Sequence, residues 1–164
     1  MRILALLALM FPLICQAANT EYFKIYMLQL RDLILEKIGN VEEMDRYIKD
    51  VEKSINQKIS TMKQLPAWGF LVMAVREDGK IKAWVDTDDE ITEDIQKAMR
   101  DTAQNTPAFA VNQGAVIFAL GFGVNGGELP MNKVPFPNEW KNSAACTNED
   151  CAEKSAEKIV LETW

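Results

Sequence analysis

The stretch from Trp68 to Gly127 constrains the fold most strongly, because its hydrophobic pattern changes from strand to helix and back to strand. Apolar residues occupy both faces of residues 68–75, which is typical of a well-covered strand. Asp78-Gly79 predicts a hairpin turn, since this pair tolerates the positive φ angles that such turns require. Residues 81–86 are then predicted to form the returning strand.

A helix and a long strand are predicted after the hairpin. Thr87 and Glu90 fit a capping box, in which each residue satisfies a backbone N–H of the other at a helix start. Four apolar residues at helical spacing predict the buried face of this helix: Ile91, Ile95, Ala98 and Met99. Residues 115–124 alternate large and small apolar residues, which predicts a strand with one face that another element can approach closely.

The region before the hairpin is predicted to be helical. Val41–Ile59 has apolar residues every three or four positions, the pattern of an amphipathic helix. Residues 18–40 are dense in large apolar residues and are predicted to form an extra N-terminal helix. Gly39 favours a break between the two, because glycine costs about 1 kcal/mol in a helix interior. The alternative is one long, coiled-coil-like helix.

The order helix, hairpin, helix, strand over residues 45–127 resembles the C-terminal domain of the TonB/TolA family. Tyr47-Ile48 matches the aromatic start of its first helix, and Asp78-Gly79 matches its hairpin turn. Pro107 and Gly114 match the loop before its last strand. The resemblance implies an α+β fold, with a small three-stranded antiparallel sheet and packed helices. It also implies a partner-binding module that has no catalytic centre and no cofactor.

The function implied by the resemblance is β-augmentation, in which a partner's extended segment adds a strand to an open sheet edge. The strand at residues 115–124 is the predicted edge. Its candidate partner-binding residues are Val116, Phe118, Ala119, Gly121 and Gly123. The competing interpretation is that this strand is paired with the hairpin and that its glycines relieve crowding against a helix.

The apolar N-terminal helix predicts a second interaction surface, because a helix with so many apolar residues must pack on something. Its candidate interface residues are Tyr22, Tyr26, Leu30 and Leu33. Through this surface the chain could self-associate, or act as an inhibitor, immunity or chaperone-like protein that presents the helix to a client. The main expectation remains a binding or assembly module whose partner is another periplasmic or envelope protein.

Residues 1–17 have the pattern of a signal peptide. Arg2 supplies a positive start, Ile3–Cys15 is almost entirely apolar, and Cys15-Gln16-Ala17 resembles a cleavage site. The apolar run is shorter than the about 20 residues that span a bilayer, so an uncleaved anchor is disfavoured. A lipidated Cys15 is also disfavoured, because Ile14 precedes it. The predicted location is therefore the periplasm or the outside of the cell.

The remaining domain boundaries follow from these elements. Residues 18–40 form the N-terminal helix, residues 41–128 the TonB/TolA-like domain, and residues 129–164 a Pro-containing extension with a short helix. Cys146 and Cys151 in this extension are predicted to form a disulfide, as expected for an even pair in an oxidising compartment. A redox site would require Cys-x-x-Cys, which this spacing does not provide.

Composition excludes several kinds of chemistry. The chain has no histidine, which excludes Ser-His-Asp and Cys-His catalysis. Its net charge of −6 makes nucleic acid an unsuitable partner, because Lys and Arg contacts to phosphate supply that affinity. Asp86, Asp88, Asp89 and Glu90 are interpreted as helix-capping residues rather than a calcium site, since Ile91 occupies the position that an EF-hand loop gives to glycine. We expect no enzyme activity and no bound metal.

Overall fold

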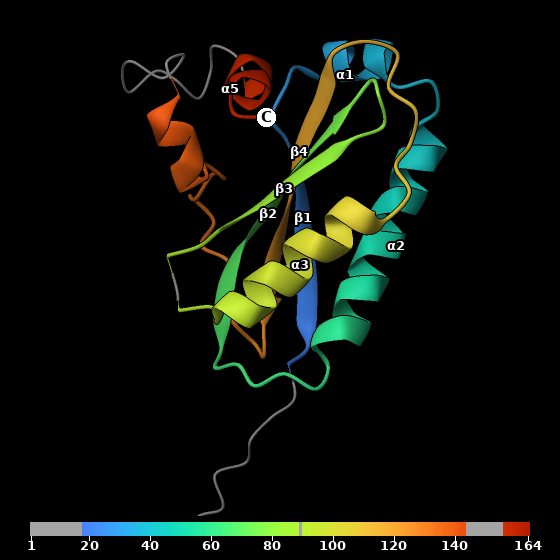
Figure 1. The fold of residues 1–164 in the computed structure, drawn as a ribbon. Coiled ribbons are helices and arrows are strands. Elements are labelled where there is room, and N and C mark those ends of the chain that lie inside the picture. Colours follow the sequence, from blue (N-terminus) through green and yellow to red (C-terminus); the bar gives the residue numbers. More distant parts are fainter. Residues whose placement is uncertain (1–17, 89, 144–155) are drawn as a thin grey trace, which may run out of the picture.

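The computed structural model describes residues 18–88, 90–143 and 156–164 of the chain (Figure 1). The predicted signal peptide, residues 1–17, and the predicted Cys146–Cys151 disulfide lie outside these residues. In chain order the elements are β1 (Thr20–Met27), α1 (Arg31–Lys37), α2 (Val41–Ile59), β2 (Ala67–Arg76), β3 (Ile81–Asp86), α3 (Glu93–Asn105), β4 (Ala115–Val124), the 3-10 helix η1 (Asn138–Asn142) and α5 (Ala156–Glu162).

The four strands form one antiparallel sheet in the order β1-β4-β2-β3 (Figure 1). The α+β class is as predicted, but the predicted three-stranded sheet is wrong. The fourth strand is β1, which pairs with β4 from Thr20↔Val124 to Met27↔Phe118. Between residues 41 and 128 the order of elements is the predicted one: helix, hairpin, helix, strand.

The prediction of one N-terminal helix over residues 18–40 is wrong, because β1 lies within this range. Its first half is a strand, and only the seven residues of α1 are helical. Thr, Tyr, Phe and Ile dominate β1, and these β-branched and aromatic residues fit a pleated surface better than a helix. The break near Gly39 is confirmed, because α2 begins after Asn40, whose side chain accepts a hydrogen bond from the N–H of Glu42.

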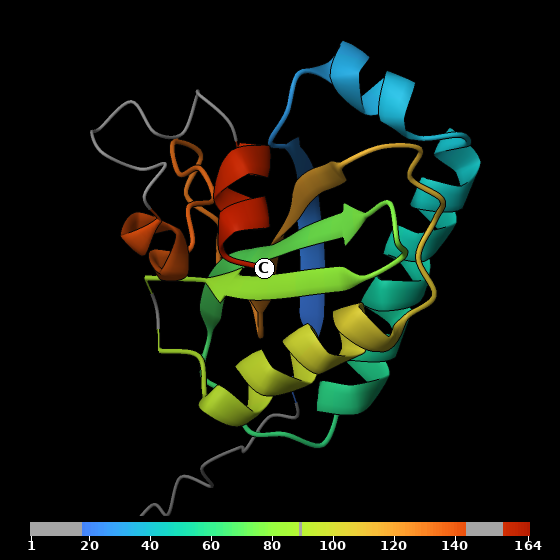
Figure 2. The ribbon, with the colours of Figure 1, turned by 45° about the horizontal axis from the view of Figure 1, so that its top comes forward.

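Helices α2 and α3 cover one face of the sheet (Figures 1 and 2). The predicted apolar stripe of α2 is buried there except for Val41, which is 57% exposed, and Ile95, Ala98 and Met99 of α3 are buried as predicted. Ile91, predicted on the same helix, is also buried but precedes α3. Tyr47 of α2 donates a hydrogen bond of 2.9 Å to the carbonyl of Ala103 near the C-terminal end of α3. This bond satisfies one of the carbonyls that lack an intrahelical partner at a helix end.

The C-terminal extension covers the opposite face of the sheet. Trp140 of η1 and Ile159 and Val160 of α5 pack with sheet residues such as Val72 and Trp84. The rings of Trp84 and Trp140 meet edge to face at 5.5 Å. The sheet therefore lies between two layers, and neither face is free over its centre.

The predicted capping box at Thr87 is also wrong. Helix α3 begins after Thr92, whose side chain makes no capping hydrogen bond. The hydroxyl of Thr87 instead donates to the carbonyl of Trp68, which ties the end of β3 to the start of β2. A tertiary contact has replaced the local one that the sequence pattern suggested.

Candidate partner-binding edge

Strand β4, the predicted open edge, lies inside the sheet. It pairs with β1 on one side and with β2 along its whole length on the other, and all ten of its residues are buried. Val116 and Phe118 face the core beneath α2 and α3, whereas Ala119 faces the C-terminal layer. The assignment of these residues to an edge is therefore wrong, because β1 occupies the hydrogen-bonding positions that a partner would need.

The small residues of β4 serve packing within the chain. A Cβ at Gly121 would lie 2.6 Å from Cδ2 of Leu129, and one at Gly123 would lie 2.0 Å from the carbonyl oxygen of Gly127. Phe23 of β1 also lies against Gly123, with ring atoms 2.9 Å from the same Cβ position. The interpretation that these glycines relieve crowding is supported, but the crowding comes from β1 and residues 127–129 and not from the predicted helix.

The predicted helix-interface residues do not share a helical face. Tyr22 and Tyr26 lie on β1, and both are half-buried. Tyr22 packs near Phe122 in the α2–α3 core, and burial raises the pKa of its phenol above the ordinary value, with a further contribution from the charge of Glu52. Leu30 and Leu33 lie beyond the strand, at and just after the start of α1, and are exposed.

The outer edge of β1 is open among the described residues. The N–H of Leu28 donates to the carbonyl of Ile117 of β4. This bond shows which backbone groups of β1 point toward β4. Backbone groups alternate in direction along an antiparallel strand, so the N–H and C=O of Met27 and of Ile25 point away from β4. β1 has no second strand neighbour, and no hydrogen bond from another described element reaches these groups.

The side chains on this part of β1 are exposed and apolar. Ile25 is 42% exposed and Met27 is 46% exposed. The first half of the strand is better protected, since a bulge at Phe23 interrupts the register and the N–H of Thr20 donates to the side chain of Asn56. Bulges and charged residues such as Lys24 are common devices that block unwanted strand pairing. Residues 25–27 of β1 have neither device.

The other edge of the sheet, β3, is covered. None of its six residues is exposed, and α3 packs along it (Figure 2). The ammonium group of Lys82 donates to the carbonyl of Thr163, after α5. Of the two edges, β1 is therefore the one that a partner can reach.

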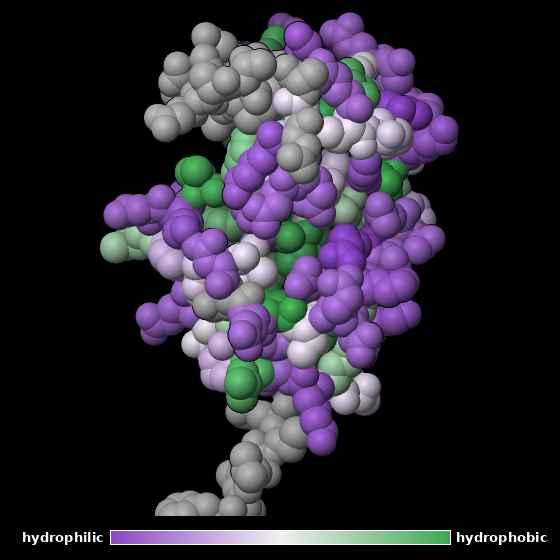
Figure 3. Space-filling model, turned by 60° about the vertical axis from the view of Figure 1, so that its left-hand side comes forward, coloured by the Kyte–Doolittle hydropathy of each residue, from purple (hydrophilic) through white to green (hydrophobic). Residues whose placement is uncertain are grey.

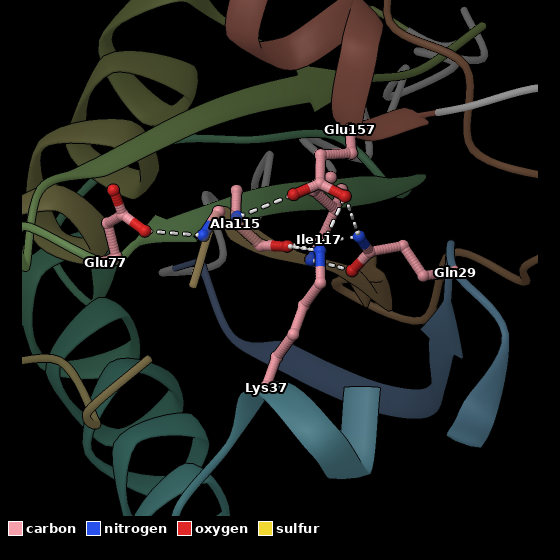
Figure 4. A network of polar contacts seen from close by, with 7 residues as sticks. Gln29, Lys37, Glu77, Ala115, Ile117 and Glu157 are labelled. Atoms are coloured by element: carbon pink, nitrogen blue, oxygen red, sulfur yellow. Dashed lines mark hydrogen bonds and ion pairs between the residues drawn. The ribbon is translucent and has the colours of Figure 1, made fainter. Parts of the chain in front are cut away.

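A polar network closes β4 beyond the end of β1 (Figure 4). The side-chain amide of Gln29 accepts a hydrogen bond from the N–H of Ile117 at 3.0 Å and donates to the carbonyl of Ala115 at 3.1 Å. This amide takes the place of a peptide group of a neighbouring strand. Glu157 of α5 accepts from the N–H of Ala115 at 2.9 Å and pairs with the buried ammonium of Lys37 at 2.5 Å. The open edge thus stops at Met27.

Two shallow grooves lie along β1 on the side of the C-terminal layer. The Met131 groove, of about 530 Å³, is lined by Phe23, Lys24, Tyr26 and residues 128–131. The Trp140 groove, of about 700 Å³, is lined by residues 27–30, residues 134–136, Trp140, Ala156 and Ile159. On the face in Figure 3, hydrophobic side chains appear as small separate groups among hydrophilic ones, so that face offers no broad apolar patch.

The predicted helix-capping acidic residues include Asp89, which lies outside the described residues. Among the described residues, no group of three or more Asp, Glu, His or Cys side chains could hold a metal ion. Asp86 accepts a hydrogen bond of 2.7 Å from the N–H of Phe136, which fastens the C-terminal extension to β3. Burial raises the pKa of the Asp86 carboxyl above its ordinary value, although that hydrogen bond opposes the shift.

The sequence prediction missed Ile25, Met27 and the two grooves. Residues 128–131 and 134–136 contribute to the two grooves, but the sequence there predicted only a Pro-containing extension. One available signal was the β-branched and aromatic content of residues 20–26, which indicates a strand. The pairing of β1 with β4 joins residues about 100 positions apart, and no local pattern reveals such a contact.

Together, these observations define a small α+β protein. Its sheet is covered on both faces, and β1 is the accessible edge strand among the described residues. No protein-family model, curated protein or solved structure matches the chain. The resemblance to the TonB/TolA C-terminal domain thus remains a prediction. Among the helices that the structure describes, none has the length and apolar character needed to cross a membrane.

Proposed function

We propose that this protein is a non-catalytic binding module that accepts an extended segment of a partner protein along the outer edge of β1. The proposal rests on the outward backbone groups of Ile25 and Met27, which have no partner among the described residues and lie beside exposed apolar side chains. Strand addition at such an edge gains affinity from main-chain hydrogen bonds and specificity from alternate side chains. The resemblance over residues 45–127 supports the same class of function.

The open part of the edge is short, which limits the affinity that backbone pairing alone provides. Each hydrogen bond to Ile25 or Met27 contributes about 1 kcal/mol net, because it replaces a bond to water. Such an edge binds a segment reversibly unless side-chain contacts add to it. A reversible partner is consistent with an assembly or signalling role rather than a permanent subunit.

We include export to the periplasm in the proposal, on the basis of the signal-like pattern in residues 1–17. The test is the mass of the full chain after expression in a bacterial host with a periplasm. Cleavage after Ala17 and recovery from the periplasm are expected. Recovery from the cytoplasm with residues 1–17 intact would contradict this part. Titration of the same sample should detect no free thiol if Cys146 and Cys151 are paired.

A selection experiment tests edge binding directly. The folded protein is used to select binders from a library of random 12-residue peptides, and affinities are measured for the wild type and Ile25→Pro. Proline removes only an N–H that points away from β4, so the sheet can be retained. We expect the selected peptides to lose at least tenfold in affinity for this variant.

Two further variants make the result decisive. Ile25→Lys keeps the N–H but adds an edge-blocking charge, and it should weaken binding even if Ile25→Pro does not fold. Val41→Lys, at the exposed start of α2, is the matched control and should bind normally. A selection that yields no binder, or binders equally tight to all variants, would refute edge binding.

One observation favours a second candidate function. Leu30, Leu33 and Leu35 of the α1 region are exposed, at 75%, 45% and 46%. An inhibitor or chaperone-like protein could present this short apolar surface to a client. Leu33→Lys distinguishes the two, because it should abolish binding through α1 and leave binding at Ile25 unchanged.

A further inference from the structure

The two grooves beside β1 follow one another along the strand. Phe23, Lys24 and Tyr26 line the Met131 groove, and the residues just after them, Met27–Leu30, line the Trp140 groove. The opposite walls follow in the same order, from residues 128–131 to residues 134–136. The grooves are therefore two successive sites beside the same strand, and both lie outside the region that resembles the TonB/TolA domain.

The grooves differ in chemistry. None of the described residues that line the Trp140 groove carries a charge, and Leu28, Val134, Phe136 and Trp140 give it an apolar wall. A charged partner side chain would lose its hydration there without compensation, so the groove selects against it. The Met131 groove is also largely apolar, but Lys24 and Glu128 stand at its wall. It suits a large side chain that is apolar along its length and polar at its tip, such as tyrosine.

The spacing follows from strand geometry. On the β1 side, the Met131 groove is lined by residues 23, 24 and 26, and the Trp140 groove by Met27 at the end of β1 and the three residues that follow it. The two sets of lining residues are therefore offset by about four positions along the chain. Four residues of extended chain span about 13 Å, and residues separated by four share one face of a strand. A strand added beside β1 would therefore direct its residues i and i+4 toward the two grooves.

We propose that the partner segment is an extended peptide with two large uncharged side chains four positions apart, one in each groove. The proposal rests on the proposed function, because the backbone pairing at Ile25 and Met27 sets the register. The largely apolar Trp140 groove fixes one side chain, and the Met131 groove accepts an aromatic or long apolar one. The pairing supplies the general affinity, and the grooves supply the choice of sequence.

The test uses the peptides selected in the library experiment. We expect them to share two large uncharged residues at a spacing of four. Val134 is 68% exposed and Met131 is 98% exposed, so Val134→Asp and Met131→Asp should fold normally. Val134→Asp should lower the affinity at least tenfold, whereas Leu65→Asp, at an exposed residue outside both grooves, should leave it unchanged.

Peptide substitutions then assign each side chain to its groove. Replacing one of the two shared residues by alanine should remove most of the effect of Val134→Asp, and replacing the other should remove most of the effect of Met131→Asp. Peptides that depend on Ile25 but show no preferred spacing and ignore both groove variants would overturn the groove proposal and leave the edge function standing. Peptides that do not depend on Ile25 would overturn both.

Discussion

The ion pair between Lys37 and Glu157 holds α5 against the start of β4, and Glu157→Ala measures its contribution. Only 9% of the Lys37 side chain and 29% of the Glu157 side chain are exposed. Removing one partner of a buried pair typically costs 3–5 kcal/mol, because the other charge stays buried and unpaired. The partial exposure of Glu157 lets water reach the site, so we expect a loss of about 3 kcal/mol.

The assay is urea unfolding followed by circular dichroism. For a small protein the free energy falls by about 1–3 kcal/mol per molar urea, so the midpoint should fall by about 1–3 M. The matched control is Asp45→Ala, which removes the exposed pair with Lys49, where the side chains are 57% and 69% exposed. Pairs of that kind contribute about 0–1 kcal/mol.

A double variant separates charge burial from loss of packing. Lys37→Met with Glu157→Leu removes both charges, and we expect it to be more stable than Glu157→Ala alone. A midpoint for Glu157→Ala within experimental error of Asp45→Ala would refute the reasoning. So would a double variant that is less stable than the single one.

Two further predictions concern the burial of Asp86 and the packing of Gly123. Asp86→Asn keeps an acceptor for the N–H of Phe136 but removes a carboxylate whose pKa is raised by burial. The folded state binds the proton of the Asp86 carboxyl more tightly than the unfolded state does, so wild-type stability should fall as pH rises through the raised pKa. Asp86→Asn should therefore raise the melting temperature more at pH 7 than at pH 4. Gly123→Ala should lower the free energy of unfolding by about 2 kcal/mol or more, because its Cβ meets the backbone of Gly127. Gly39→Ala, with open space around it, is the control and should change that free energy by no more than about 0.5 kcal/mol in urea unfolding. Equal effects of the two glycine substitutions would contradict the packing of Gly127 on β4.

Local patterns in the sequence predicted the features that local physics determines. The hairpin turns at Gly79, whose φ of 76° is in the region that favours glycine, and Asp78 accepts a hydrogen bond from the N–H of Lys80. The apolar stripe of α2 follows from its helical period, and Asn40 provides a standard cap. None of these features depends on residues far away in the chain.

The incorrect predictions concern long-range pairing. β1 has enough apolar residues to resemble a helix buried on all sides, but pairing with β4 satisfies its backbone instead. That pairing turned the predicted edge into an interior strand and moved the candidate site to Ile25 and Met27. The cover of the second sheet face by Trp140 and α5 is likewise a contact between distant segments, which neither composition nor periodicity indicates.

Amide hydrogen exchange at Ile25 and Met27 tests the central claim most directly. In the free protein these two N–H groups should exchange quickly, because they point outward from an edge strand, while those of Tyr26 and Leu28 should be protected by β4. Addition of a selected peptide should slow exchange at Ile25 and Met27 without changing the residues of β3. Unchanged exchange at these two amides in a saturated complex would contradict binding at the β1 edge.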